Sequence, residues 1–153
     1  MAIDPTMYDL YYGPTDVETM IPHEDLHNYE HCFVKLVDDK EVGPFAATDD
    51  IAYGVLINQP IPGTGPSLDA KVQTSGVAKL KTGTGGLAAG DLVGANSGGA
   101  GITIVPGSGT DGTIVWGQCV VGAAEGLCAA VRLLAVRSLS DMPEVKKCQI
   151  TIA

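Results

Sequence analysis

From residue 31 onward, hydrophobic and polar residues alternate in short runs that are separated by glycine-rich turns. The runs CFVKLV and AKVQTSGVAKLK alternate with a period of two, which is typical of strands that bury one face. The nearly continuous apolar run IAYGVLI indicates a strand buried on both faces. Short strands at this regular spacing predict an all-β fold, as a small barrel or sandwich. The expected strands are residues 32–37, 51–57, 70–81, 91–95, 102–105, 113–124 and 127–134, and 146–152 closes the chain.

The segment EGLCAAVRLLAVRSL, residues 125–139, admits two interpretations. Alanine, leucine and arginine are good helix formers, which favours a helix. Leu127, Ala129, Val131 and Leu133 alternate with smaller or polar residues, which favours a strand. We predict a strand over 127–134.

The first 21 residues show neither helical nor strand periodicity. Pro5, Gly13 and Pro14 exclude a long helix, yet the segment is too apolar for a solvated tail. We therefore expect residues 1–30 to form a largely irregular, extended N-terminal arm that lies against its own domain or a neighbouring subunit. We expect residues 31–153 to form the β-barrel domain. The apolar residues of the arm are Met7, Tyr8, Leu10, Tyr11, Tyr12, Met20 and Ile21.

Charge is low and unevenly placed. Charged residues make up 18% of the 153-residue chain, and 12 of the 18 acidic residues fall in residues 1–50. No basic patch is available to neutralise phosphates, so nucleic-acid binding is not expected. No apolar run reaches the length of a membrane span. The acidic half is either a solvated surface or a face for a basic or polar partner.

Four cysteines occur without a C-x-x-C pair, and the N-terminus has no secretory signal pattern. These features predict a reducing compartment and free, mostly buried thiols.

Glycine motifs and paired aspartates are more simply explained as turns. GSGTDG (107–112) matches G-x-G-x-x-G, and GTGGLA (83–88) matches its looser form, but no helix is expected after either one to bind a phosphate. The pairs Asp38-Asp39 and Asp49-Asp50 lie between expected strands, where aspartate is favoured for its local backbone hydrogen bonds.

All three histidines fall in PHEDLHNYEHC (22–32), as His23, His27 and His31. On a helix the outer two lie roughly 12 Å apart along the axis, too far to share one metal ion. We therefore expect no metal site and a short polar turn of helix, with Pro22 near its start, that leads into the first barrel strand. Because histidine titrates near pH 6.5, its charging beside acidic neighbours is a hypothetical pH response of the arm.

The strand and turn pattern over about residues 32–136 resembles the capsid decoration (cement) proteins of tailed bacteriophages. The resemblance lies in FVKLVDDKEVGPFAATDDIAYGVLINQPIPG, in AKVQTSGVAKLKTGTGGLAAGDLVGANSGGAGI, and in the later GQCVVGAAEGLCAAVRLL. The matching positions are Ala47, Thr48, Asp50, Ile51, Gly54, Val55, Leu56, Pro60, Gly63, Val72, Gly76, Gly90, Asp91 and Val93.

This resemblance implies a small β-barrel or β-tulip-like domain on the outer surface of an expanded phage head. It implies a structural virion protein, made in the host cytoplasm, that is often a trimer and bridges and stabilises subunits of the major capsid protein. It implies no enzymatic activity and no cofactor. From the arm's composition we add that five residues contact a capsid subunit or an adjacent copy: Tyr8, Leu10, Tyr11, Tyr12 and Met20.

Two other function classes stay open at this point. One is a β-barrel binding module for a glycan or peptide, although residues 32–153 offer few aromatic side chains for sugar stacking. The other is a small metal-dependent enzyme, which only the histidine cluster supports.

Overall fold

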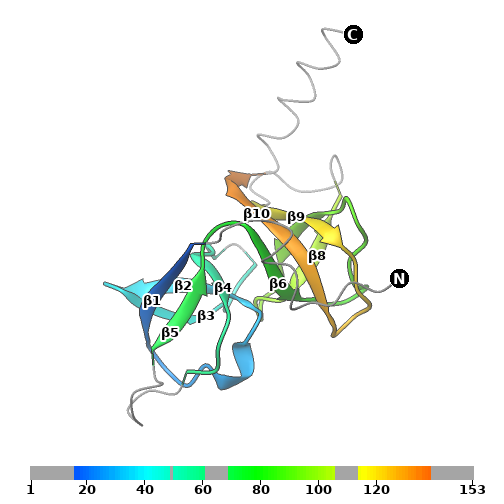
Figure 1. Ribbon diagram of the computed structural model, residues 1–153. Helices are drawn as coiled ribbons and strands as arrows, with labels where there is room; N and C mark the ends of the chain where they lie inside the picture. The colour runs from blue at the N-terminus through cyan, green and yellow to red at the C-terminus, as the bar shows by residue number, and fades with distance from the viewer. Residues whose placement is uncertain (1–15, 49, 61–68, 106–113, 139–153) are drawn as a thin grey trace, which may run out of the picture.

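The computed structural model describes residues 16–48, 50–60, 69–105 and 114–138. Within these ranges the chain is all-β, as expected, and forms two sheets (Figure 1). No helix in the described part is long and apolar enough to cross a membrane. The elements are β1 (Val17–Pro22), the 3₁₀ helix η2 (His27–Tyr29), β2 (Phe33–Asp38), β3 (Glu41–Pro44), β4 (Gly54–Leu56), β5 (Ala70–Gln73), β6 (Val77–Lys81), β7 (Leu92–Ala95), β8 (Gly101–Ile104), β9 (Ile114–Val121) and β10 (Cys128–Ser138).

The first sheet is a closed five-stranded barrel with the strand order β1-β3-β2-β4-β5. All its neighbouring strands are antiparallel except β1 and β3. The barrel interior is filled by a cluster that we call the barrel core. Its members are Met20, Leu26, Val34, Val42, Leu56, Ala70 and Val72.

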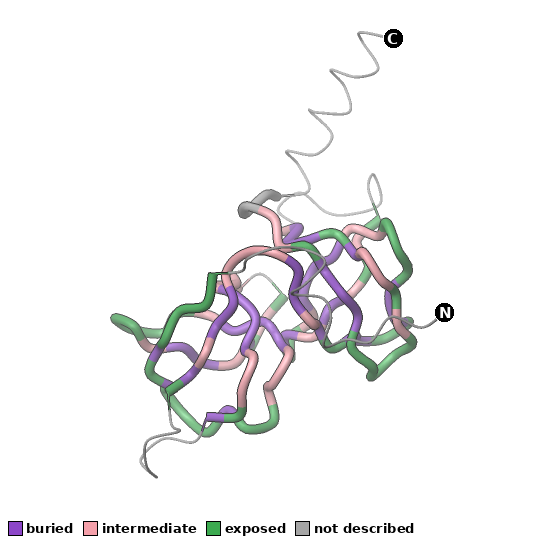
Figure 2. Tube along the Cα trace, viewed as in Figure 1, coloured by how far each residue is buried: buried purple, intermediate pink, exposed green. Residues whose placement is uncertain are grey.

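The second sheet has the order β6-β10-β9-β7-β8, and β5 leads directly into β6. Its buried face packs against side chains of the barrel and forms a second cluster, which we call the junction core. Figure 2 shows buried positions in both sheets and where they meet. The junction core comprises Phe33, Phe45, Val55, Ala78, Leu80, Leu87, Val93, Ala95, Trp116, Cys119, Ala129 and Val131.

β2 joins the two cores because its first two residues are buried on opposite faces. Val34 is fully buried in the barrel core, whereas Phe33, one residue earlier, points the other way into the junction core. The Phe33 ring lies 6.3 Å, between centroids, from both Phe45 and Trp116. The barrel and the second sheet therefore share one packed interior.

The expected boundary at residue 30 is wrong, because the fold begins earlier. β1 pairs with β5 over Val17–Met20 and with β3 at Ile21 and Pro22. Residues 17–30 are thus part of the barrel, and only residues 1–15 lie outside the described structure at this end. An irregular arm that extends to residue 30 is not what the chain forms.

Several strand predictions are confirmed and others need correction. The strand expected at 127–134 is confirmed as part of β10, so the helix alternative fails. No strand is expected between residues 37 and 51, yet β3 lies there, and the expected strand 51–57 is reduced to β4. The expected strand 70–81 is split in two at Gly76, which has a φ of 79° that suits glycine. Residues 107–112 and 146–152 lie outside the described ranges.

Candidate binding groove

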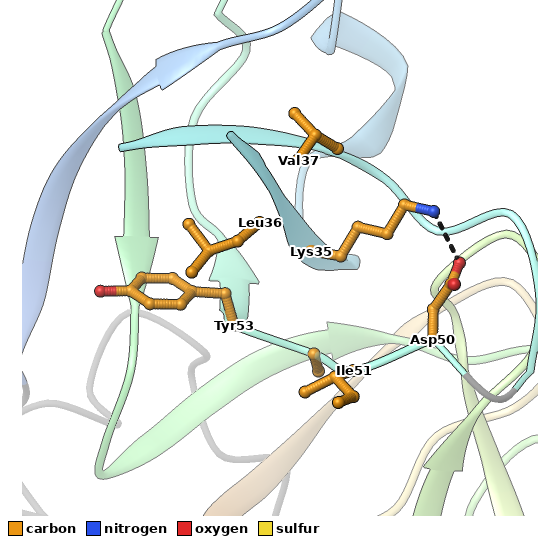
Figure 3. A pocket seen from close by; sticks show the side chains of 7 residues that line it. Lys35, Leu36, Val37, Asp50, Ile51 and Tyr53 are labelled. Carbon is orange, nitrogen blue, oxygen red and sulfur yellow. Dashed lines mark hydrogen bonds and ion pairs between the residues drawn. The ribbon is translucent and has the colours of Figure 1, made fainter. Parts of the chain in front are cut away.

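The barrel wall opens where β2 and the chain before β4 separate. β2 pairs with β4 only through Phe33 and Val34, and the Tyr53 N–H donates to the Val34 carbonyl over 2.8 Å. Beyond that bond, the described structure holds no backbone hydrogen bond between residues 35–37 and residues 50–53. The two segments diverge and leave a hollow of about 690 Å³ between them (Figure 3). We call this hollow the barrel-edge groove.

An open strand edge lies along one wall of the groove. Backbone groups of alternate residues point to the same edge of a strand, and the Val34 carbonyl points toward β4. The N–H and C=O of Leu36, two residues later, therefore face the groove, while β3 pairs with the opposite edge of β2. The groove thus offers backbone donors and acceptors to an extended chain.

Exposed aliphatic side chains gather along the same groove. Leu36 is 48% exposed, Val37 is 38% exposed and Ile51 is 65% exposed. These are high values for large apolar side chains, and contiguous exposure of this kind marks interaction surfaces. The hollow is therefore suited to apolar contact.

The charges of the groove neutralise each other. Asp50 Oδ2 accepts hydrogen bonds from the Ala46 N–H (2.8 Å), the Ala47 N–H (3.0 Å) and Lys35 Nζ (3.0 Å). The Ala46 amide, the Lys35 ammonium and the Ala47 amide together lower the pKa of Asp50. Asp50 therefore fixes the turn and the Lys35 side chain, as expected of a turn aspartate. Asp49, its partner in the sequence motif, lies outside the described residues.

Tyr53 forms the inner end of the groove. Its ring packs against the barrel core, and its hydroxyl donates a short hydrogen bond to Glu18 of β1. This hydrogen bond, with some burial, raises the pKa of Tyr53. The bond connects the groove wall to the strand that begins the fold.

A smaller hollow of about 190 Å³ lies on the other side of Ala52 and Tyr53. It reaches the junction between the barrel and the second sheet, where Trp116 and Leu133 line it. The Trp116 Nε1–H is buried without an acceptor in the described part of the chain. The segment 52–53 therefore has hollows on both sides.

The sequence-predicted contact residues are not brought together by the described structure. Met20 is buried at 5% exposure in the barrel core, so its side chain packs within its own chain. Tyr8, Leu10, Tyr11 and Tyr12 lie outside the described residues.

Each histidine lies beside a different acidic residue. His23 Nδ1 is 3.1 Å from Glu41 Oε2, and His27 Nδ1 is 2.6 Å from Asp25 Oδ1. In the described residues no three His, Cys, Asp or Glu side chains are grouped closely enough to hold a metal ion. The expected helical turn is present as η2, but Pro22 ends β1 and does not begin that turn.

His31 differs from the other two histidines because it joins the two sheets. Its N–H donates to the Leu56 carbonyl of the barrel, and its carbonyl accepts from the Lys81 N–H of the second sheet. Its Nδ1 is buried without a hydrogen-bond partner in the described structure. Burial lowers the pKa of His31, and nearby Glu30 partly offsets this effect.

The described cysteines are free, with Cys32 and Cys119 buried and Cys128 exposed. Burial raises the pKa of the Cys32 and Cys119 thiols, which disfavours the reactive thiolate. These thiols are packing residues and not candidate nucleophiles.

Sequence reasoning misses the groove because its signal is indirect. The run IAYGVLI reads as one buried strand, so Ile51 is expected inside. The available signal was Asp49-Asp50 before the run and the glycine inside it, because such residues mark chain irregularities.

Comparisons with known proteins give one informative result. No family model matches the chain, and no curated protein matches it. Among solved structures, the chain is similar to the N base of the head fiber gp8.5 of bacteriophage phi29. The TM-score is 0.54 at 18% sequence identity, over 79% of this chain and 95% of that one. This likeness establishes a shared fold that includes nearly the whole of the phi29 base.

Proposed function

We propose that the chain is a structural virion protein that binds the outer surface of an expanded phage head. The observation that carries this proposal is the shared fold with a phage head fiber base, matched over 95% of that protein. The resemblance of residues 32–136 to decoration proteins supports the same assignment from the sequence. The structure adds a surface suited to binding, the barrel-edge groove.

In this proposal the chain contacts the major capsid protein and bridges its subunits, as a trimer. A protein that binds only the expanded lattice stabilises that lattice by mass action. Several attachment points per oligomer multiply weak individual contacts. The arm residues Tyr8, Leu10, Tyr11 and Tyr12 would provide apolar anchors toward an adjacent copy or a capsid subunit.

The test is co-sedimentation with empty heads of the phage that encodes the chain. Expanded heads should bind the chain saturably, and unexpanded shells should bind it much more weakly. In a separate assay, DNA-filled heads that carry the chain should release their DNA at a higher temperature than DNA-filled heads without it. Equal binding to both lattices, or no binding to either, would contradict the proposal.

The groove also supports a second candidate, a peptide-binding module of the same fold. Its open Leu36 edge and aliphatic lining fit an extended peptide. A glycan is less well matched, because Tyr53 is the single aromatic residue among the described residues that line the groove. Peptide-array binding that Ile51→Asn abolishes, together with no head binding, would favour this candidate.

A further inference from the structure

The barrel-edge groove has the features of a site that accepts an added strand. One wall presents the backbone edge of Leu36, which pairs with no strand in the described part of the chain, and the other is the diverging segment 50–53. Leu36, Val37 and Ile51 supply apolar side chains on both walls. An extended segment placed here would gain main-chain hydrogen bonds and apolar contacts together, which is the mode known as strand addition.

Asp16 precedes β1, and the strand order places β1 across the barrel from the gap between β2 and β4. In the closed order β1-β3-β2-β4-β5, the gap between β2 and β4 is separated from β1 by β3 in one direction and by β5 in the other. Asp16 is held against β5, because its N–H donates to Ser75 Oγ (3.1 Å) and its carbonyl accepts from the Thr74 N–H (2.9 Å). The Tyr53 side chain, whose hydroxyl is hydrogen-bonded to Glu18, lies between β1 and the groove. A segment that precedes Asp16 would have to pass β3, β5 or the Tyr53 side chain to enter the groove of its own copy, which favours the groove of a second copy.

The length of this segment is sufficient to reach another copy. Fifteen extended residues span up to about 50 Å. The radius of gyration of a domain of this size is about 14 Å. A neighbouring groove is therefore within reach even when several residues serve as a linker.

The chemistry of the segment matches that of the groove. In an extended MYDLYY (7–12), Tyr8, Leu10 and Tyr12 alternate and so lie on one face. That face is apolar and without charge, and the groove charges Lys35 and Asp50 already neutralise each other. Tyrosine also has high strand propensity.

We infer that residues 7–12 of each copy enter the barrel-edge groove of an adjacent copy as an added strand. This inference rests on the proposed function, because it identifies the contact that holds the copies together. Each copy gives one arm and accepts one, so the contact is heterologous and closes into a ring when the rotation permits. A ring of three would be the proposed trimer.

The experiment uses full-length chains and two classes of variant. The groove variant is Ile51→Asn, and its matched control is Leu127→Asn, because the two side chains are 65% and 62% exposed and Leu127 lies just before β10, away from the groove lining. The arm variant carries Tyr8→Ser, Leu10→Ser and Tyr12→Ser, and its control carries Met7→Ser and Tyr11→Ser on the opposite face. Circular dichroism confirms that each variant is folded, and sedimentation velocity gives its mass.

The wild type and both controls should form an oligomer, and each class of variant alone should associate at least about tenfold more weakly. The decisive step is to mix the groove variant with the arm variant, since the mixture contains one intact arm and one intact groove. A 1:1 complex supports exchange between copies. A mixture that stays monomeric, or a wild type that is monomeric at every concentration, overturns the inference.

Head binding is measured separately on the same proteins. A monomeric wild type that still binds expanded heads would overturn the arm exchange and leave the proposed function standing. A chain that oligomerises through the groove but does not bind heads would support the arm exchange and contradict the proposed function.

Discussion

Truncation of Phe33 is a stringent test of the shared interior. The side chain is 1% exposed and packs with Phe45 and Trp116 in the junction core, while its neighbour Val34 fills the barrel core. Phe33→Ala removes a fully buried ring and leaves a cavity, which costs about 3–5 kcal/mol. For a domain of this size, 1 kcal/mol corresponds to about 2–4 °C in Tm, so the expected decrease is about 6–20 °C.

The assay is differential scanning calorimetry together with urea unfolding followed by Trp116 fluorescence and by circular dichroism. Because β2 belongs to both cores, all probes should report one transition that moves as a whole. Phe33→Leu keeps most of the apolar volume and should cost less than about 1.5 kcal/mol. Leu127→Ala, on an exposed side chain, should change stability by no more than about 0.5 kcal/mol.

Two outcomes would refute this reasoning. A decrease below about 1 kcal/mol for Phe33→Ala would show that the ring is not packed as described. A transition that splits, with only the part assigned to the second sheet displaced, would show that the barrel and the second sheet are independent folding units.

The remaining predictions concern one glycine and one histidine. Gly54→Ala should destabilise the fold by about 1–3 kcal/mol or more, because the new Cβ would lie 2.4 Å from the Gln73 carbonyl oxygen. At Gly98 the nearest atom to such a Cβ is 3.5 Å away, so Gly98→Ala should leave stability nearly unchanged. A urea titration measures both variants. Because burial lowers the pKa of His31, the unfolded chain binds more protons than the folded one, so stability should fall as the pH decreases below about 6.5. His31→Asn, which tolerates the φ of 65° at this position, should reduce that slope, and an unchanged slope would contradict the assignment.

Two long strands of the second sheet could be predicted because they are rich in β-branched and apolar residues. β9 and β10 fall where the sequence places them, although three consecutive residues are buried in each. β1 is much harder to recognise, because its apolar residues occupy both faces: Met20 is buried in the barrel, but Val17 and Ile21 are exposed. Its place in the barrel depends on pairing with β5, about 50 residues later, which no local pattern records.

The groove could not be predicted for a related reason. Ile51 and Val55 belong to one apolar run, yet Ile51 is exposed and Val55 is fully buried. The difference arises because the β2–β4 ladder ends near Tyr53, so Ile51 is not drawn into the sheet. The end of a strand ladder is decided by tertiary pairing and not by the residues of one strand.

Electron cryo-microscopy of expanded heads incubated with the chain tests the central proposal most directly. We predict added density on the outer surface, in contact with major capsid protein subunits, into which the five-stranded barrel and the second sheet fit together. Heads that carry no added density at saturating concentrations of the chain would contradict it.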